Sequence, residues 1–376
     1  MKILMLNYEF PPIGGGAGHA NLCLLQEYSH HKEIQVDVLT SQSGTGVTVD
    51  NFSSNIRIYK VGIHKKNLHY WTKLEVIEWL WKARSCYAKL LQENSYDLSH
   101  AFFAFPSGWL CYRTAGWIPY ILSLRGSDVP GYNVRLGLDY KLLAGLFRKI
   151  WSRASLIAAN SRGLCQLANR FMPNRDIAVI PNGVDTQYYH PAPQKKIGEP
   201  LNLLSVGRLI TRKRIDWLIN TVGFAVGKGL NVRLNIVGEG NLLSDLRQKA
   251  AAMNLSDNVN FMGLVGRQQM PEVYRANDIF VMASQHEGMS NAMLEAIASG
   301  LPVVTTPCEG VEELIGDNGI LVNYPDLEAF FTAINRIRTD NDKYTAMSKA
   351  SRKMAETFSW SAVAQQYIHY YQQLIH

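Results

Sequence analysis

Residues 278–306, DIFVMASQHEGMSNAMLEAIASGLPVVTT, contain the patterns of a strand, a helix and a second strand in immediate succession. The apolar runs DIFVMAS and PVVTT are typical of buried strands, and the segment from 291 to 299 is typical of a helix. Two strands joined by a helix form a βαβ unit, in which the strands are parallel. The stretch therefore predicts a parallel sheet covered by helices.

The same alternation of short apolar runs and helical patterns extends over the chain of 376 residues. This length suggests two domains, and the polar, proline-containing stretch HPAPQKKIGEP at 190–200 has the composition of a linker. We expect an α/β fold of two doubly wound, Rossmann-like domains, over residues 1–189 and 201–359, that face each other across a cleft. Ligands of such folds bind at the carboxyl ends of the strands, so the cleft is the expected site.

The composition is that of a globular protein, with 47% hydrophobic and 18% charged residues. No stretch has the pattern of a signal peptide, and no apolar run approaches the roughly 20 residues that span a bilayer. The sequence therefore predicts a cytoplasmic protein. Five widely spaced cysteines indicate free thiols and no zinc site: Cys23, Cys86, Cys111, Cys165 and Cys308.

The positive charge is confined to the first half of the chain. Residues 1–190 hold 20 Lys and Arg against 13 Asp and Glu, and residues 191–376 hold 18 of each. Nucleic acid and anionic membranes are common partners of a basic face, and the absence of a zinc-finger or RNA-binding motif argues against nucleic acid. The stretch 64–91 mixes lysines with Tyr70, Trp71, Trp79 and Trp81. It predicts either an ordinary amphipathic helix on the sheet or a peripheral contact with an anionic membrane, at the inner face of the cell membrane.

A glycine cluster, GGGAG at 14–18, follows the first apolar run. A dinucleotide-binding G-x-G-x-x-G would need a glycine where His19 or Asn21 stands, and there is no G-K-[ST] of a P-loop. The glycines therefore serve a tight turn with positive φ, or they let the backbone at Gly15 and Gly16 approach a ligand.

Two glutamates, Glu287 and Glu295, are separated by seven residues around a predicted helix start. Glu287 would precede the helix and Glu295 would lie one turn inside it. The backbone amides of Gly288–Asn291 would point out of the helix N-terminus, which favours anions. The alternative is a helix cap with one solvated glutamate.

The stretch SVGRLITRKRID, 205–216, places several cations at a predicted turn from a strand into a helix. Arg208 and Lys213 could converge on a diphosphate, because the helix dipole disfavours cations at that end unless an anion binds there. The alternative is a basic turn exposed to water. Charge alone does not separate these two residues from Arg212 and Arg214.

Together these segments resemble the retaining glycosyltransferases of family 4, which have the GT-B fold. The resemblance rests on PPIGGGAG, VIPNGVDTQYYHP, VGRLITRKRID, IVGEG, VNFMGLV, EGMSNAMLEAIASGLPVV and GVEELIGDNGILV, in the order and spacing of the family. It implies an acceptor-side first domain, a C-terminal helix at about 360–376 that packs back on it, and a second domain that binds a nucleotide-sugar donor.

The resemblance also implies roles for individual residues. Arg208 and Lys213 would neutralise the leaving diphosphate, Glu295 would bind the ribose, and Glu287 would contact the transferred sugar. The glycine loop would reach the donor's phosphates from across the cleft. The remaining donor contacts that it implies are Gly15, Gly16, Gly288, Met289, Ser290, Asn291, Leu264 and Val265.

The implied reaction moves a hexose-type sugar from a nucleotide diphosphate sugar to a glycan, glycolipid or lipid-linked acceptor in cell-envelope or exopolysaccharide synthesis. Two cations and helix amides can stabilise the leaving group, so no cofactor or metal is expected; the D-x-D at 340–342 has the setting of a solvated loop. Nucleotide-sugar 2-epimerases share the architecture and provide the alternative function, and a binding protein with a dead site is a third.

The chain departs from the family at SLRGSDVPGY, where Arg125 precedes Gly126 and many relatives carry a histidine. Arginine cannot act as a general base. Arg125 could instead hold a phosphate or an anionic acceptor, or Asp128 could make the polar contacts. His19, beside the glycine loop, could contact substrate or serve the structure.

Overall fold

The computed structural model describes residues 1–68, 70–133, 136–193, 195–308 and 310–375. The chain divides into two compact units, Met1–Asn182 with Trp360–His376, and Gly183–Ser359. The boundary thus lies seven residues before the predicted position 189, and the stretch 190–200 belongs to the second unit. The reason is local: the Val184 amide donates to Phe358 O, and Tyr189 is buried in a core of the second unit.

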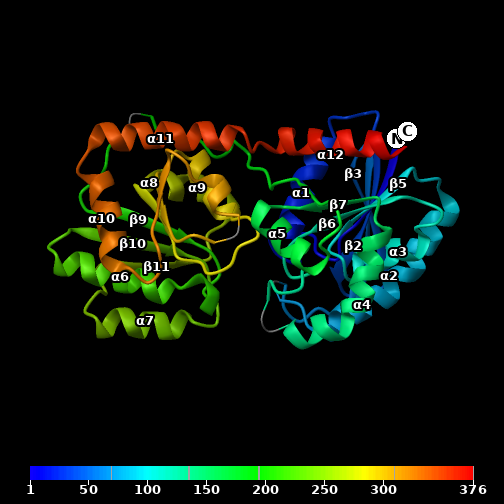
Figure 1. Ribbon diagram of the computed structural model, residues 1–376, viewed down its shortest axis with the longest axis horizontal. Helices are drawn as coiled ribbons and strands as arrows, with labels where there is room; N and C mark the ends of the chain where they lie inside the picture. The colour runs from blue at the N-terminus through cyan, green and yellow to red at the C-terminus, as the bar shows by residue number, and fades with distance from the viewer. Residues whose placement is uncertain (69, 134–135, 194, 309, 376) are drawn as a thin grey trace. The chain divides into compact units, whose positions relative to one another are not determined.

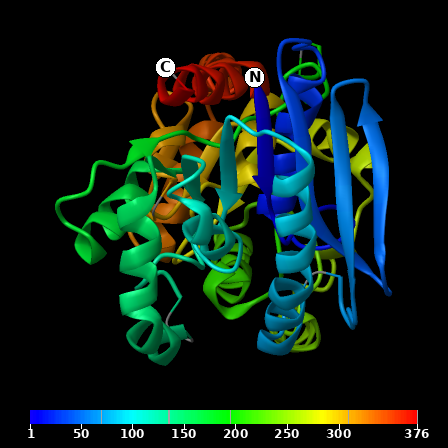
Figure 2. The same cartoon turned by 90° about the vertical axis from the view of Figure 1, so that its right-hand side faces the viewer.

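The first unit contains an eight-stranded sheet in the order β3-β4-β2-β1-β5-β6-β7-β8. Every neighbouring pair is parallel except β3 and β4, the antiparallel pair visible at one edge in Figure 2. The central strands β5 and β6 are buried along their whole length, as expected where helices cover both faces. The strands are β1 (Lys2–Leu6), β2 (Gln35–Ser43), β3 (Val47–Ser53), β4 (Ile56–Ile63), β5 (Leu98–Phe102), β6 (Tyr120–Leu124), β7 (Leu156–Ala159) and β8 (Ala178–Val179).

The helices of the first unit include one from the far end of the chain (Figure 1). This helix, α12, packs against α1 and β5. A buried network fastens it, because His100 on β5 bonds to the Tyr371 hydroxyl at 2.6 Å and to Ser123 Oγ at 2.7 Å. The helices are α1 (Gly16–Tyr28), α2 (Lys73–Glu93), α3 (Ser107–Thr114), α4 (Gly137–Arg153), α5 (Arg162–Phe171) and α12 (Trp360–Ile375).

The second unit contains a six-stranded parallel sheet in the order β11-β10-β9-β12-β13-β14. The order reverses at β9, which is the mark of a doubly wound sheet. Both units therefore confirm the predicted α/β class. The strands are β9 (Leu201–Val206), β10 (Val232–Val237), β11 (Val259–Gly263), β12 (Ile279–Met282), β13 (Val303–Thr305) and β14 (Gly319–Leu321).

The helices of the second unit follow its strands along the chain (Figure 1). The predicted strand–helix–strand of the opening stretch is β12, α9 and β13, with β12 and β13 paired in parallel. Within the described ranges, no helix is both long and apolar enough to cross a bilayer. The helices are η2 (Thr211–Lys213), α6 (Ile215–Gly227), α7 (Leu243–Ala252), η3 (Arg267–Gln269), α8 (Met270–Ala276), α9 (Asn291–Ala298), η4 (Glu312–Leu314), α10 (Leu327–Arg338) and α11 (Asn341–Glu356).

Candidate functional site

An ion pair between Lys213 and Glu287 lies at the carboxyl ends of β9 and β12. The Lys213 ammonium donates to Glu287 Oε1, and both side chains are largely buried. Burial alone would raise the pKa of Glu287, but the charges of Lys213 and, less strongly, Arg212 outweigh it, and the pKa lies below its ordinary value. Glu287 is therefore ionised at neutral pH, and it holds the lysine in place.

The two loops that carry this pair are tied together through the backbone. The Gln285 amide donates to Arg212 O at 2.8 Å, and the Lys213 amide donates to Ile210 O at 3.0 Å, which closes the turn of η2. These bonds fix the position of the Lys213 backbone and the path of the loop before α9. The geometry of the pair is consequently set by the fold and not by the two side chains alone.

Glycines at the ends of neighbouring strands let the loops pack closely. Gly207 and Gly238 have φ of +155° and +131°, and a Cβ on Gly238 would lie 2.1 Å from Gly207 O. The same Gly207 lies against Lys213, whose Cε is 3.4 Å from the position of an added Cβ. Arg208 follows directly and is exposed. In the described part of the chain, no hydrogen bond or ion pair involves its side chain.

The structure distinguishes Arg214, Lys213 and Arg208, which charge alone did not. Arg214 has a left-handed conformation with φ of 50°, and it forms two hydrogen bonds of 3.0 Å with Asp216. Its guanidinium also lies 4.6 Å from the centre of the Tyr324 ring. Arg214 therefore serves the start of α6, whereas Lys213 pairs with Glu287 and Arg208 is open to solvent.

The segment from Gly288 to Asn291 forms the N-terminus of α9, as predicted. Ser290 is the cap, and its Oγ accepts from the Met293 amide at 3.3 Å. Met289 is buried, and Gly310 packs so tightly that an added Cβ would lie 1.9 Å from Gly288 O. The path of this loop is thus fixed on one side by a glycine that the sequence did not single out.

Glu295 lies one turn inside α9 and is half-buried. The Tyr274 hydroxyl donates to its Oε2 at 2.8 Å, and Tyr189 also interacts with the carboxyl group. Burial raises the pKa of Glu295 to about 7, even though both tyrosines and Arg267 favour the ionised form. Glu295 is therefore close to half-protonated at neutral pH.

The two residues predicted to line a base pocket follow β11. Leu264 is 66% exposed, and Val265 is partly buried against a core of the second unit. Between them they offer an apolar surface beyond the carboxyl end of the strand. Arg267 begins η3 nearby in sequence, and its carbonyl accepts from the Tyr188 hydroxyl at 3.0 Å.

The glycines in the loop of the first unit differ in their surroundings. Gly14 has φ of +99°, and its added Cβ would lie 2.6 Å from Glu9 Cβ, so this residue meets the requirement of the turn. Gly15 and Gly16 are exposed, and a Cβ on Gly15 would meet nothing within 4 Å. The Gly15 amide donates to the Glu9 carboxylate at 3.1 Å. The turn therefore requires Gly14, whereas a Cβ on Gly15, the N-cap residue of α1, would meet no neighbouring atom.

The three residues considered for sugar or acceptor contacts differ in their surroundings. Asp128 is buried, and its oxygens accept from the amides of Arg125, Gly126 and Ala104 at 2.8, 3.0 and 2.9 Å. It shapes the loop after β6. His19 is half-buried on α1, with Nε2 3.5 Å from Cys23 Sγ. Arg125 follows β6 and is partly buried.

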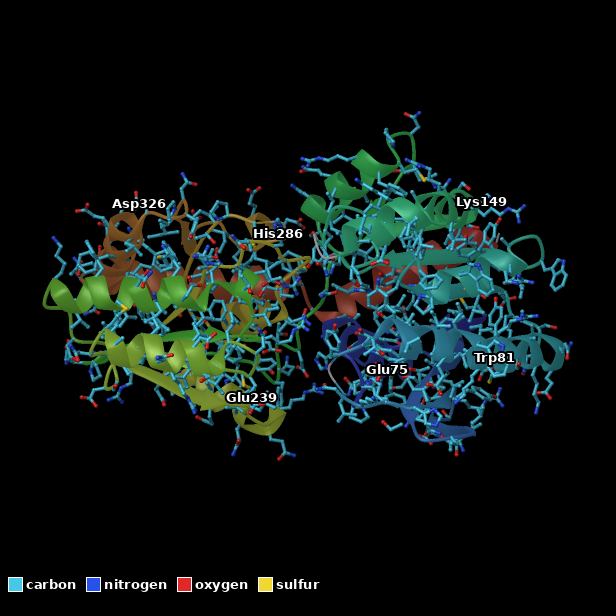
Figure 3. All side chains as sticks on the ribbon, turned by 90° about the horizontal axis from the view of Figure 1, so that it is seen from below. Glu75, Trp81, Lys149, Glu239, His286 and Asp326 are labelled. Carbon is cyan, nitrogen blue, oxygen red and sulfur yellow. The ribbon has the colours of Figure 1, made fainter. Side chains whose placement is uncertain are left out.

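Most of the basic and aromatic stretch 64–91 lies in α2, whose residues Glu75 and Trp81 are labelled in Figure 3. Its side chains differ in burial. Lys65 is buried, pairs with Glu75 at 2.9 Å and lies 4.1 Å from the centre of the Trp71 ring, so it does not face solvent. Trp79 is fully buried. An exposed apolar stripe remains on the helix, formed by Leu74, Ile77 and Trp81 at 78%, 57% and 73% exposure.

Other candidate metal and redox features carry no site in the described residues. No group of three His, Cys, Asp or Glu side chains there is arranged to hold a metal ion. Asp340 of the D-x-D caps α11 by accepting from the Lys343 amide at 2.9 Å. All five cysteines are free thiols.

Sequence reasoning missed two residues beside Glu295 and the side-chain role of a third residue that it had named. Tyr189 and Tyr274 contact Glu295, and Ser290 was expected only for its amide although its hydroxyl caps α9. The YY at 188–189 was visible in the sequence, but nothing there indicates that it folds against a helix about a hundred residues later. Structure alone supplies that contact.

Comparison with known proteins identifies the two units. Residues 14–188 match the family described as Glycosyltransferase Family 4, and residues 200–340 match the family described as Glycosyl transferases group 1. The chain is 26% identical to the UDP-Gal:alpha-D-GlcNAc-diphosphoundecaprenol alpha-1,3-galactosyltransferase of Escherichia coli, over 93% of this chain and 92% of the relative. It is 29% identical to the lipopolysaccharide core biosynthesis glycosyltransferase LpsE of Rhizobium meliloti (strain 1021), over 67% of this chain and 73% of the relative.

Solved structures show the same fold. Sucrose-phosphate synthase from Thermosynechococcus elongatus superimposes with a TM-score of 0.82 at 22% identity, covering 99% of this chain and 98% of that one. HepE from Anabaena in complex with UDP gives 0.73 at 20% identity, covering 99% and 100%. The GT-B fold predicted from the sequence resemblance is therefore confirmed.

Proposed function

Because the chain belongs to glycosyltransferase family 4 over residues 14–188 and to the group 1 glycosyl transferases over residues 200–340, we propose that it is a retaining, metal-independent hexosyltransferase with a nucleotide diphosphate sugar as donor. The observation that carries this proposal is the Lys213–Glu287 pair in front of the N-terminus of α9. The pair places a fixed cation beside the N-terminus of a helix, at the carboxyl edge of a doubly wound sheet. Ligands of such sheets bind at this edge.

The chemistry of the leaving group explains this arrangement. When the glycosidic bond to the nucleotide breaks, negative charge develops on the diphosphate, and cations aimed at it lower the barrier. We assign this role to Lys213 and to the exposed Arg208. Amides of the segment from Gly288 to Asn291 add the positive end of the α9 dipole. These groups supply the required charge without a metal or cofactor.

The remaining donor contacts follow from the same geometry. The Glu295 carboxyl group accepts hydrogen bonds from the ribose hydroxyls. Glu287 contacts the transferred sugar, and Leu264 and Val265 lie against the base. A Cβ on Gly15 would meet no neighbouring atom of the fold. We therefore assign Gly15 and Gly16 to close approach of the backbone to the donor's phosphates.

The names of the relatives favour an acceptor in the cell envelope. The Escherichia coli relative is named for transfer from UDP-Gal to GlcNAc-diphosphoundecaprenol, and the Rhizobium relative for lipopolysaccharide core biosynthesis. We propose a glycan, glycolipid or lipid-linked acceptor for this chain as well. No observation specifically favours a nucleotide-sugar 2-epimerase, whereas both matching family models are described as glycosyltransferases.

Substitution of Lys213 tests the proposal. The donor is first selected by thermal stabilisation with UDP-, GDP- and ADP-sugars, since a bound donor raises Tm. Lys213→Ala should then lower the rate of nucleotide release by about 100- to 1,000-fold, the usual effect of removing one group that stabilises developing charge. Lys228→Ala is the matched control, because Lys228 is exposed at the C-terminal end of α6. Full activity of Lys213→Ala would remove Lys213 from the mechanism.

We also propose a peripheral contact between the first unit and the inner face of an anionic membrane, and hence a cytoplasmic, membrane-associated enzyme. The exposed stripe of α2 is one part of the surface, and Leu138 and Leu142 of α4 are 76% and 83% exposed. A 2.7 Å ion pair between Lys73 and Asp139 joins the N-terminal ends of the two helices. Exposed apolar side chains with basic neighbours suit the headgroup region of a bilayer.

Vesicle flotation tests this contact. The double variant Ile77→Ser with Trp81→Ser should lose at least about tenfold in binding to vesicles of phosphatidylcholine and phosphatidylglycerol, since each exposed side chain would otherwise leave water. Val49→Ser on β3, also exposed, is the control. Lysine substitutions are less informative, because Lys65 is buried against Glu75. Equal flotation of the double variant and the control would refute the surface.

A further inference from the structure

Arg125 carries a positive charge that forms no direct ion pair with a carboxylate of the described residues, and Asp128 acts on it only through space. Its Nη1 donates to Asn182 Oδ1 at 2.8 Å, and its guanidinium lies 4.4 Å from the centre of the Phe102 ring. Its Nε is buried, and among the described residues neither a hydrogen-bond acceptor for this atom nor an ion-pairing carboxylate is present. Withdrawing a charged donor from water without a partner is unfavourable. The arrangement therefore favours an anion that comes from outside the chain.

The neighbouring carboxylate does not fill this role. Asp128 directs its two oxygens to three backbone amides, including that of Arg125 itself. The next residue, Gly126, has φ of +112°, and an added Cβ would lie 2.8 Å from the Tyr132 ring. Asp128 and Gly126 thus fix the loop from which Arg125 projects. The guanidinium is positioned in advance, which lowers the entropy lost on binding.

A second polar group without a partner lies at the same edge of the sheet. Leu124 and Ala159 are register partners at the ends of β6 and β7, so Arg125 and Asn160 follow adjacent strands. Asn160 is only 6% exposed, and its Oδ1 accepts no hydrogen bond from the described residues. An amide oxygen can only accept, so its missing partner is a donor such as a hydroxyl.

Backbone strain occurs at this edge as well. Phe103 follows Phe102 at the end of β5 and has φ of 70°, a conformation that a bulky side chain rarely adopts. Such residues persist where the surroundings impose them, and they concentrate at functional sites. Phe103 is buried, its amide donates to Ser123 O, and the following amide donates to Asp128. The strained segment therefore supports the loop that holds Arg125.

We propose that Arg125, Asn160 and Asn182 form a subsite for a negatively charged group of the sugar substrate that has a hydroxyl beside it. The guanidinium binds the anionic oxygens, and the Asn160 oxygen accepts from the hydroxyl. The inference rests on the proposed transferase function, because it names the class of substrate that this transferase takes. The anion has two sources, the carboxylate of a hexuronic acid on the donor or a phosphate that links the acceptor sugar to its carrier.

Two pairs of probes distinguish these sources. The donor pair is UDP-glucuronate and UDP-glucose, and the acceptor pair is octyl-diphosphate-GlcNAc and octyl-GlcNAc. The donor pair differs by a carboxylate in place of a hydroxymethyl group, and the acceptor pair differs by the diphosphate. Affinity is measured by calorimetry on the full chain. We expect the wild-type protein to prefer the charged member of one pair by about 10- to 100-fold, the usual effect of a charge-assisted hydrogen-bonded pair.

Arg125→Met should abolish that preference and leave the affinity for the neutral member unchanged. Arg125→Lys, which keeps the charge without the planar fork, should retain only part of it. Arg113→Met is the matched control, because Arg113 is exposed on α3 and lies 5.1 Å from the centre of the Trp109 ring. If Arg125→Met does not fold, the wild type and Arg125→Lys still test the proposal.

Two results would overturn the subsite: a wild-type protein without preference in either pair, or an Arg125→Met variant that keeps the preference. The proposed function fails in a different way. If no nucleotide or nucleotide sugar binds and Lys213→Ala changes nothing, the transferase assignment is wrong. If donor binding depends on Lys213 but Arg125→Met has no effect, only the anionic subsite is wrong.

Discussion

Donor binding should weaken as the pH falls through neutrality, because of the state of Glu295. Burial raises the pKa of this carboxyl group to about 7, and the Tyr274 hydroxyl donates to it at 2.8 Å. In the proposed complex the ribose hydroxyls donate to the same group, which favours its ionised form. The donor therefore binds the carboxylate better than the acid, and binding is linked to the loss of a proton.

The expected size follows from the ionised fraction. With a pKa of about 7, Glu295 is about nine-tenths ionised at pH 8 and about one-tenth ionised at pH 6. If only the ionised form binds, affinity falls about tenfold between these values, which corresponds to about 1.4 kcal/mol. The linkage has this sign because donor binding lowers the pKa of a group whose pKa is raised in the free protein.

Calorimetric titrations with the selected nucleotide sugar at pH 6, 7 and 8 provide the assay. A nucleotide sugar is preferable to a free nucleoside diphosphate, whose terminal phosphate titrates near pH 6. Glu295→Gln cannot titrate and should flatten the profile at reduced affinity. Tyr274→Phe removes a donor to the carboxylate and should move the midpoint above pH 7. An unchanged slope in Glu295→Gln would refute the reasoning, since another group would then cause the pH dependence.

Two further predictions concern the first unit. Gly14→Ala should lower Tm, because Gly14 has φ of +99° and the new Cβ would lie 2.6 Å from Glu9 Cβ. Gly15→Ala should lower turnover and have the smaller effect on Tm, since its Cβ would meet no neighbouring atom. A larger loss of Tm in Gly15→Ala than in Gly14→Ala would contradict the assignment. Burial, with a smaller effect of Arg125, lowers the pKa of His100 below its unfolded value of about 6.5, so its contribution to stability is present above that pH and is lost as the pH falls below it. Urea unfolding at pH 7.5 and 5.5 should show an acid loss of up to about 1.4 kcal/mol per pH unit, and His100→Gln should remove that part of the slope.

The secondary structure was accessible from the sequence because it depends on local patterns. The run IFVM and the helical spacing after Asn291 each need only neighbouring residues to be interpreted, and β12, α9 and β13 are found where they were expected. The position of Glu295 one turn inside α9 follows from the same spacing. Periodicity thus places a residue on its element and orients it roughly.

Pairing across the fold was not accessible in this way. The turn at 211–214 holds three of the four cations, and what distinguishes them is a partner two residues away for Arg214 and 74 residues away for Lys213. Lys65 illustrates the same limit. Its charge suggested a membrane contact, yet its side chain is buried in an ion pair with Glu75, which belongs to the capping box of α2. The capping pattern T-x-x-E at 72–75 was in the sequence, but the approach of Lys65 to it is tertiary.

In the proposed complex, the charge balance around Lys213 favours a role for the helix terminus beside that of the cations. Glu287 already neutralises Lys213, so in the free protein this pair carries no net charge. A bound diphosphate brings about two negative charges and competes with Glu287 for the ammonium. Arg208, exposed and next to Gly207, supplies one uncompensated cation. In the proposed complex the amides at the start of α9 add to the positive charge of Arg208 and Arg212, and Gly310 and Ser290 fix the segment that carries these amides.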